Sequence, residues 1–282
     1  MDELKVGDIV ARKSYGKDVF FKVVDLRNEG DENIATLKGI CYRIEADAPE
    51  SDLEKQNEER VSEYTRKSFL PAERKAREII PSNRRRYSKK VFYRDTSNDK
   101  DRSFSNPGKV LHIDGDENYL ETCMEEYKKF KLNVVGKHVA EKEQPSAVFK
   151  LLETYRPDIL VLTGHDGVIK GDDSYLNLSS YRNSRYFVEA VKEARRYDRD
   201  LASLVIFAGA CQSMYNEILK AGANFASSPY RVLIHALDPV YVCQKVALGG
   251  IDRVLTPSDV IRATITGSKG IGGIDTRGKF RN

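Results

Sequence analysis

The chain has 282 residues, 40% of them hydrophobic, and a formal net charge of +4. This composition allows most of the chain to fold, in about two domains. No apolar run approaches the ~18–20 residues of a membrane span. The start Met1-Asp2-Glu3-Leu4-Lys5 is acidic and lacks the apolar core of a secretory signal, so we expect synthesis and action inside a cell, without membrane insertion.

The N-terminal part, residues 1–48, contains short β-branched and aromatic runs separated by Gly, Asp and Asn. Such runs are typical of strands joined by turns and predict a small SH3-like β-barrel module. The runs are Ile9–Arg12, Val19–Val24 and Ala35–Gly39.

The positive charge is concentrated in the middle of the chain. Residues 51–100 hold 14 Lys/Arg and 9 Asp/Glu, a net of +5, which leaves about −1 for the rest and argues against a broad nucleic-acid-binding surface on the C-terminal part. We interpret residues 49–106 as a charged linker, flexible or helical. A helix is expected over Asp52–Lys67, with Pro71 and Pro81 interrupting any longer one.

Residues 107–282 alternate between apolar strands and amphipathic helices. This alternation predicts an α/β domain with a mostly parallel sheet and helices on both faces. The expected strands are Val110–Ile113, Val134–Val135, Asp158–Leu162, Leu204–Ala208 and Val232–Ile234, and the expected helices are Glu117–Phe130, Ser146–Tyr155, Ser184–Tyr197 and Met214–Ala221.

Polar and reactive residues follow three of these strands, at the edge where open α/β sheets place their sites. The strands run into Asp114-Gly115-Asp116, Thr163-Gly164-His165-Asp166-Gly167 and Gly209-Ala210-Cys211-Gln212-Ser213. A thiol just before a helix is favoured as a thiolate, and a histidine nearby can serve as its base. We therefore predict Cys211 as nucleophile and His165 as base, provided that their strands are neighbours.

The other cysteines and histidines fit this chemistry less well. None of the cysteines forms a CxxC pair and no cluster has metal-ligand spacing, so we predict no metal and no cofactor. His235, at the end of a predicted strand, is the second candidate base. Two alternatives stay open: an adaptor that binds an acidic partner through the N-terminal module and basic linker, and a nucleotide-binding protein. The latter rests on Gly267–Gly273, which lacks the spacing of a phosphate-binding loop.

The spacing of the two strand ends resembles that of the caspase, clostripain and gingipain group of cysteine peptidases, although Asp166 stands where that group has Gly. Longer blocks resemble the YabG family of sporulation-specific proteases. These blocks are Val6–Tyr15, Pro107–Asp116, Tyr155–Leu160, Thr163–Asp166, Phe207–Ser213, Ala221–Pro229 and Ile234–Tyr241. The resemblance implies a caspase-like peptidase domain over 107–282. It also implies cleavage of spore coat and cortex-associated proteins after Arg or Lys, and self-cleavage. The place of action would be the sporulating mother cell and then the forming spore coat.

A peptidase of this kind needs oxyanion donors and, for basic substrates, an acidic pocket. The backbone N–H groups of Cys211 and of Asp166 or Gly167 are the candidate donors. A buried guanidinium requires a carboxylate partner. The candidates for that partner are Asp238, which we rank first, and Asp166, Asp172 and Asp173. The candidate self-cleavage site is Arg84-Arg85-Arg86 in the linker.

Overall fold

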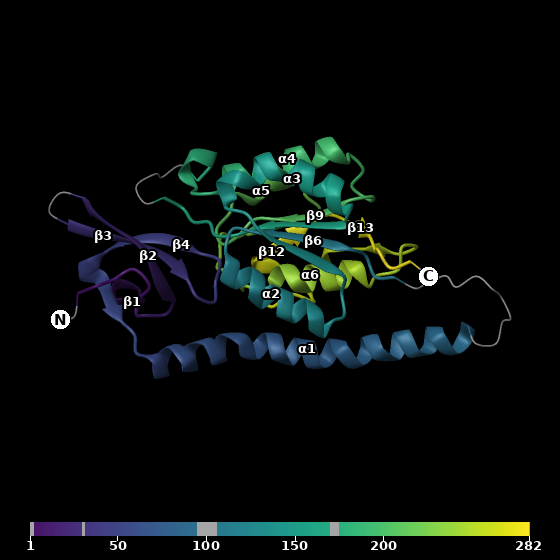
Figure 1. Cartoon of the computed structure of the whole chain (residues 1–282), viewed down its shortest axis with the longest axis horizontal. Coiled ribbons are helices and arrows are strands. Elements are labelled where there is room, and N and C mark those ends of the chain that lie inside the picture. The colour runs from purple at the N-terminus through teal and green to yellow at the C-terminus, as the bar shows by residue number, and fades with distance from the viewer. Residues whose placement is uncertain (1–2, 30–31, 95–105, 170–174, 282) are drawn as a thin grey trace.

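A computed structural model describes residues 3–29, 32–94, 106–169 and 175–281, with the backbone alone for residue 29 and residues 80–94. Figure 1 shows an N-terminal sheet at one end, a long helix α1 underneath, and an α/β domain that holds most of the chain. None of the helices in these described ranges combines the length and apolar composition that a membrane span needs.

The N-terminal sheet is antiparallel, with strand order β4-β3-β2-β1-β5. Its strands are β1 Ile9–Arg12, β2 Phe20–Glu29, β3 Glu32–Gly39, β4 Glu45–Pro49 and β5 Leu53–Lys55. Val10, Val23 and Leu37 are fully buried and form its core. The antiparallel strands confirm a β module, which continues past the predicted limit at residue 48, whereas closure into an SH3-type barrel stays a prediction.

Helix α1, Glu58–Arg94, has 37 residues and runs along the underside of the α/β domain (Figure 1). The prediction that Pro71 and Pro81 would interrupt it was wrong. A proline inside a helix removes one hydrogen bond and costs about 3 kcal/mol. Near Pro71 this cost is offset by packing, because Ala72 is buried and its carbonyl accepts a hydrogen bond of 2.7 Å from the Tyr241 hydroxyl.

The central sheet has the order β12-β10-β9-β8-β6-β7 and is parallel except for β12, which runs antiparallel to β10. This arrangement confirms the predicted α/β class with a mostly parallel sheet. The strands are β6 Val110–Asp114, β7 Val134–His138, β8 Ile159–Thr163, β9 Val205–Ala208, β10 Phe225–Ser227 and β12 Ile271–Gly273. A short pair, β11 Val254–Leu255 and β13 Thr276–Arg277, lies apart from it.

Helices cover both faces of this sheet, as predicted. Figure 1 shows α3, α4 and α5 on one face and α2 and α6 on the other. Alternate strand residues point to the two faces, so that Leu111 packs with α3 and α4 while Val110 packs with α2 and α6. The helices are α2 Glu117–Lys129, α3 Gln144–Tyr155, α4 Ser184–Tyr197, α5 Tyr215–Lys220, α6 Asp238–Ala247 and α7 Pro257–Ile261.

One predicted strand was wrong. The strand after α5 is β10, whereas Val232–Ile234 lies outside the sheet. Ile234 is nevertheless fully buried. Its carbonyl oxygen accepts a hydrogen bond of 3.2 Å from the N–H of Arg43, which lies in a loop of the N-terminal module. An apolar run signals burial, and burial here comes from a partner distant in sequence.

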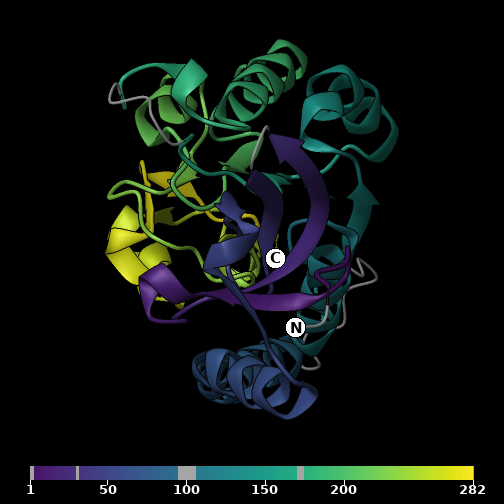
Figure 2. The ribbon, with the colours of Figure 1, turned by 90° about the vertical axis from the view of Figure 1, so that its left-hand side faces the viewer.

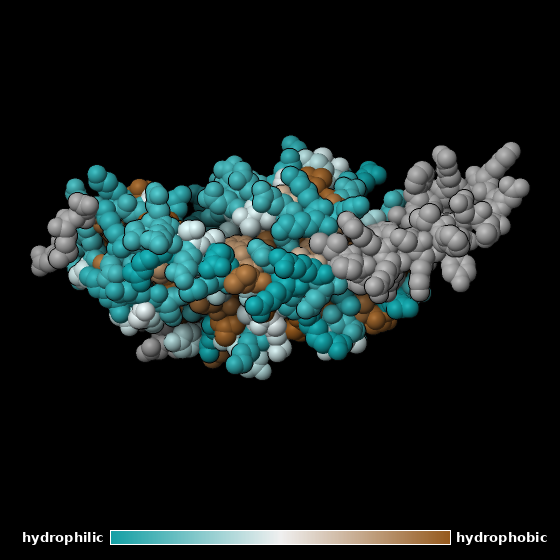
Figure 3. Space-filling view, turned by 90° about the horizontal axis from the view of Figure 1, so that it is seen from below, coloured by the Kyte–Doolittle hydropathy of each residue, from teal (hydrophilic) through white to brown (hydrophobic). Residues whose placement is uncertain are grey.

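The N-terminal sheet lies against one end of the α/β domain (Figure 2). The connection between β3 and β4, residues 40–44, enters that end and makes isolated bridges from Tyr42 to His235 and from Ile44 to Asp166. Seen from below in Figure 3, the surface is mainly hydrophilic with separate hydrophobic patches. The contacts between the β3–β4 connection and the rim of the central sheet lie inside the molecule.

Candidate active site

The strands that carry His165 and Cys211 are neighbours. β8 and β9 pair in parallel from Ile159 opposite Val205 to Leu162 opposite Ala208. Because both residues follow these last paired positions by the same number of residues, they emerge at the same rim of the sheet. The condition that the sequence left open is met.

The backbone turns sharply around Cys211. Gly209 has φ of 106° and Gln212 has φ of 56°, both in the left-handed region. Gly209 also lies close to β10, since a Cβ there would be 2.9 Å from the Ser227 hydroxyl. The glycine thus permits a turn that a larger residue would strain. The turn directs the Cys211 N–H toward the β3–β4 connection, where it donates a hydrogen bond of 3.0 Å to Arg43 O.

The Cys211 thiol is fully buried, and its Sγ accepts a hydrogen bond of 2.9 Å from the N–H of Ile234. Burial raises the pKa of this thiol well above its ordinary value, although the Ile234 amide opposes the rise. Cys211 is therefore a neutral thiol in this state of the molecule. To act as a nucleophile it must give its proton to a base nearby.

His165, the predicted base, follows β8 at the same rim. Its ring is fully buried and stacks on Tyr119 with a centroid separation of 5.1 Å, and its Nδ1 lies 3.8 Å from Asp116 Oδ2. Neither ring nitrogen has a hydrogen-bond partner within the described ranges. Burial, and after it the charge of Lys38, lowers the pKa of His165 to about 3, so the imidazole is neutral and burial disfavours its protonated form.

Asp166 connects the loop after β8 to the loop after β9. Its buried carboxylate accepts hydrogen bonds of 2.5 Å from the Ser184 hydroxyl and 2.8 Å from the Ser213 hydroxyl. Ser213 Oγ in turn accepts a hydrogen bond of 2.9 Å from Ala210 N. Burial raises the pKa of Asp166 to about 6, against the effect of these donors. The side chain therefore fixes the two loops relative to each other.

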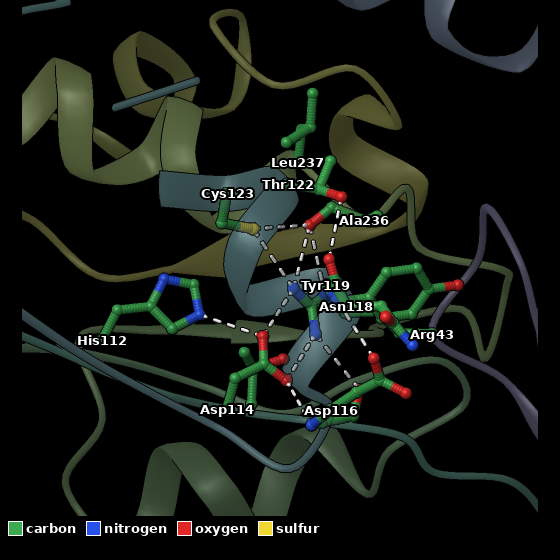
Figure 4. Close-up of polar contacts among 12 residues, drawn as sticks. Arg43, His112, Asp114, Asp116, Asn118, Tyr119, Thr122, Cys123, Ala236 and Leu237 are labelled. Atoms are coloured by element: carbon green, nitrogen blue, oxygen red, sulfur yellow. Dashed lines mark hydrogen bonds and ion pairs between the residues drawn. The ribbon is translucent and has the colours of Figure 1, made fainter. Parts of the chain in front are cut away.

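The Arg43 side chain is fully buried beside this rim (Figure 4). Its guanidinium lies 2.9 Å from Asp114 Oδ2 and donates a second hydrogen bond of 3.0 Å to Asp114 Oδ1. It also donates to Ala236 O at 3.1 and 3.2 Å, and lies 4.9 Å from the Tyr119 ring centroid. Burial opposes ionisation of Asp114, but the Arg43 charge prevails and holds the pKa of that carboxyl far below its ordinary value. This bidentate pair is the geometry in which carboxylates recognise arginine.

The carbonyl oxygen of Arg43 accepts two hydrogen bonds from the rim. The N–H of Cys211 donates at 3.0 Å and the N–H of Asp166 at 3.3 Å. Two convergent backbone donors on one peptide carbonyl, next to a thiol, are the arrangement that stabilises an oxyanion in acyl transfer. The N–H of Gly167, the third donor considered, is hydrogen-bonded to the Asp166 side chain instead.

His112, Asp114 and Cys123 form a group whose ligand atoms lie within 4.8 Å of one another. Such a group could hold a metal ion, but Asp114 already pairs with the Arg43 guanidinium, which also donates to Cys123 Sγ at 3.4 Å. The Arg43 guanidinium thus occupies the position that a metal ion would need.

Comparison of the whole chain with known proteins identifies its family. A family model described as YabG peptidase U57 matches residues 5–282. The chain is also 42% identical, over 99% of its length and 97% of the relative's, to the sporulation-specific protease YabG of Bacillus subtilis (strain 168). The chain belongs to the YabG peptidase family. This confirms the resemblance seen in the sequence and makes the chain a sporulation protease.

Within this YabG-family chain, the other predicted site residues lie as follows. Asp238, at the start of α6, accepts hydrogen bonds from the N–H groups of Ile265 and Thr266 and from the Thr266 hydroxyl. Asp172 and Asp173 lie outside the described residues, as do the side chains of Arg84, Arg85 and Arg86.

The two remaining features of the sequence take structural roles in this chain. His235, the second candidate base, contacts Ser68 O through Nε2 at 3.0 Å and accepts from Leu237 N through Nδ1 at 3.2 Å, so both ring nitrogens are engaged. Gly267–Gly273 forms a 3₁₀ turn and then β12, whose residues pair with β10. Gly272 and Gly273 therefore lie in an edge strand, whereas Gly267 and Gly270 belong to the turn before it.

The pair that sequence reasoning missed is Arg43 and Asp114. A signal for Asp114 was present, because it ends a buried strand at the same edge as His165 and Cys211. For Arg43 the sequence offers no such signal: it lies in a short connection of the N-terminal module, 71 positions before Asp114.

Proposed function

We propose that this YabG-family protease is a cysteine endopeptidase that cleaves after Arg or Lys, with Cys211 as nucleophile and His165 as general base. The observation that carries the proposal is the Arg43 carbonyl. It accepts the amides of Cys211 and Asp166 while the Arg43 side chain pairs with Asp114. A buried arginine, an oxyanion site and a thiol are thus found together, as cleavage after a basic residue requires.

The mechanism uses the two groups at the rim in turn. His165 takes the thiol proton of Cys211, and the thiolate attacks the carbonyl carbon of the scissile bond. The N–H groups of Cys211 and Asp166 stabilise the oxyanion. His165 then gives its proton to the leaving amine, and water hydrolyses the thioester.

Asp114 is the acidic group that we propose for the specificity pocket. Its carboxylate is already paired with an arginine in bidentate geometry. Asp114 also accepts a hydrogen bond from Asp116 N. Asp238 and Asp166, by contrast, accept hydrogen bonds from backbone and hydroxyl groups alone. Carboxylates engaged in this way have less capacity to bind an incoming guanidinium.

The substrates that we propose are spore coat and cortex-associated proteins, cleaved in the sporulating mother cell and then at the forming coat. Support comes from family membership, since the B. subtilis relative is a sporulation-specific protease. The adaptor alternative requires no reactive thiol, so the reactivity of Cys211 separates the two.

The test compares the wild type with Cys211→Ala and His165→Ala on reporter peptides that differ only in an Arg, Lys or Gln before the reporter group. We expect hydrolysis of the Arg and Lys peptides by the wild type and none by either variant. Cys243→Ala is the matched control, because Cys243 is also buried but lies on α6. Equal hydrolysis by the wild type and Cys211→Ala would reject the proposed nucleophile.

A further inference from the structure

The β3–β4 connection is held in the rim on both sides of Arg43. On the N-terminal side, Cys41 O accepts from Ala236 N at 3.1 Å and Arg43 N donates to Ile234 O at 3.2 Å. On the C-terminal side, Glu45 N donates to Asp166 O at 3.0 Å. Backbone pairing of this kind, with one side chain in a pocket, is how an extended peptide is recognised along a sheet or strand edge.

The chain also turns at Arg43. Ile44 N donates to Tyr42 O at 2.8 Å, and Gly39 N donates to Ile44 O at 2.9 Å. The turn places the Arg43–Ile44 peptide bond at the tip of the connection. Its carbonyl oxygen meets the amides of Asp166 and Cys211, so this bond occupies the position of a substrate bond to be cleaved.

Simple anchoring of the N-terminal module does not account for this placement. An anchor would need only the ion pair between Arg43 and Asp114. It would not need the Arg43 carbonyl directed at two amides, one of which belongs to Cys211 itself. In addition, His165 and Cys211 are both fully buried, so a second polypeptide cannot reach them while the connection stays in place.

We infer that the Arg43–Ile44 bond is the chain's first substrate, cleaved in cis, and that the intact connection keeps the site closed to other proteins. This inference rests on the proposed cysteine peptidase activity. Cys211 Sγ attacks the Arg43 carbonyl carbon, and the Arg43–Ile44 bond breaks as His165 gives its proton to the Ile44 nitrogen. Water then hydrolyses the thioester, which leaves a carboxylate on Arg43, a new amino group on Ile44 and a free thiol.

The two products, residues 1–43 and 44–282, are expected to stay together at first. β3 belongs to the first product and β4 to the second, and the two strands pair from Ile34 opposite Pro49 to Lys38 opposite Glu45. Cleavage therefore frees the ends of the connection without separating the sheet. The new ends can then leave the rim and open it to other substrates.

The experiment follows the full-length chain by intact mass under denaturing conditions, after translation in vitro and a stop of protein synthesis. We expect a product that begins at Ile44, formed at a rate that does not change on dilution. Cys211→Ala should give no product. Arg43→Lys, which keeps the charge but loses the bidentate contact, should be cut more slowly at the same bond. A variant with Arg84, Arg85 and Arg86 all changed to Gln should still be cut after Arg43.

The outcomes separate this inference from the proposed function. A wild type that hydrolyses the Arg reporter but keeps its Arg43–Ile44 bond intact would overturn the inference and leave the peptidase proposal standing. A rate that falls on dilution would overturn cleavage in cis. A wild type that neither hydrolyses the Arg reporter nor cleaves itself would reject the peptidase proposal, and the inference with it.

Discussion

The guanidinium of Arg43 lies 2.9 Å from the carboxylate of Asp114, and both side chains are fully buried. Arg43 belongs to the N-terminal module and Asp114 ends β6 of the central sheet. Each charge would be costly to bury without the other. The pair therefore connects the module to the candidate site, and it gives the most direct test of the proposed specificity for arginine.

Changing Asp114 to Asn should be strongly destabilising. The substitution leaves the buried charge of Arg43 without its partner, which costs about 3–5 kcal/mol. The measurement is urea unfolding in the Cys211→Ala background, where the chain stays whole, with a lower midpoint and an unchanged slope as the expected result. The Arg reporter should also lose its advantage over the Gln reporter in the active background.

Asp238→Asn is the comparison for that experiment. Its carboxylate accepts from the Ile265 and Thr266 amides, and an asparagine oxygen can still accept from them. We expect a smaller loss of stability and an unchanged preference for Arg. Loss of that preference in Asp238→Asn, with Asp114→Asn unaffected, would move the pocket to Asp238.

The buried His165 should make stability depend on pH. Its pKa is lowered from 6.5 to about 3 in the folded chain, first by burial. Between these values the unfolded chain binds a proton that the folded chain does not. Stability should therefore fall as the pH falls from 6.5 toward 3, by at most about 1.4 kcal/mol per pH unit.

The check for this pH effect is a pair of stability–pH curves for Cys211→Ala with and without His165→Gln. The difference between the curves is needed because the pKa of His112 is lowered by burial as well. Glutamine does not titrate, so the gap should widen with acidity over the stated window. Parallel curves would show that His165 is not buried as a neutral base.

A side chain at Gly164 should lower the activity. A Cβ there would lie 2.2 Å from Glu141 Oε1, which accepts a hydrogen bond of 2.8 Å from the backbone N–H of His165. Gly164→Ala should displace Glu141 and shift His165, and a misplacement of about 1 Å can cost about 100-fold in rate. The measurement is kcat/KM on the Arg reporter. Gly136→Ala is the control, because its Cβ would meet the movable end of Met124 at 3.0 Å. A similar small effect for both alanines would argue against this role of Gly164.

Ser213 should matter for both stability and activity. Ser213→Ala removes the hydroxyl that joins the Asp166 carboxylate to the Ala210 N–H, and leaving such buried groups unpaired costs about 1–3 kcal/mol. Reporter hydrolysis should fall too, because Cys211 follows Ala210. Thr154→Ala, which removes an exposed hydroxyl bonded to Lys150 O, is the control for thermal unfolding and activity. The assignment fails if Ser213→Ala behaves like Thr154→Ala.

The alternation of strands and helices was enough to predict the α/β class and the four neighbouring parallel strands β6 to β9, but neither β10 nor β12. Runs such as Ile159–Thr163 are apolar on both faces because helices cover both, and that pattern is local. The placement of His165 and Cys211 after such strands followed from the same pattern. The helix through Pro71 and the burial of Ile234 outside the sheet could not be predicted, since both depend on partners distant in sequence.

What the sequence alone determined is therefore the α/β class and the edge at which reactive groups gather, because these depend on periodicity and on the ends of parallel strands. The tertiary structure alone decided which carboxylate meets an arginine and which carbonyl meets the two amides. Arg43, Asp114 and Cys211 come from distant parts of the chain. Only the packing of the N-terminal module against the sheet brings the buried Arg43 guanidinium to the Asp114 carboxylate. The free energy of that pair depends on the desolvation of both charges and on their attraction, and no local sequence pattern reveals either.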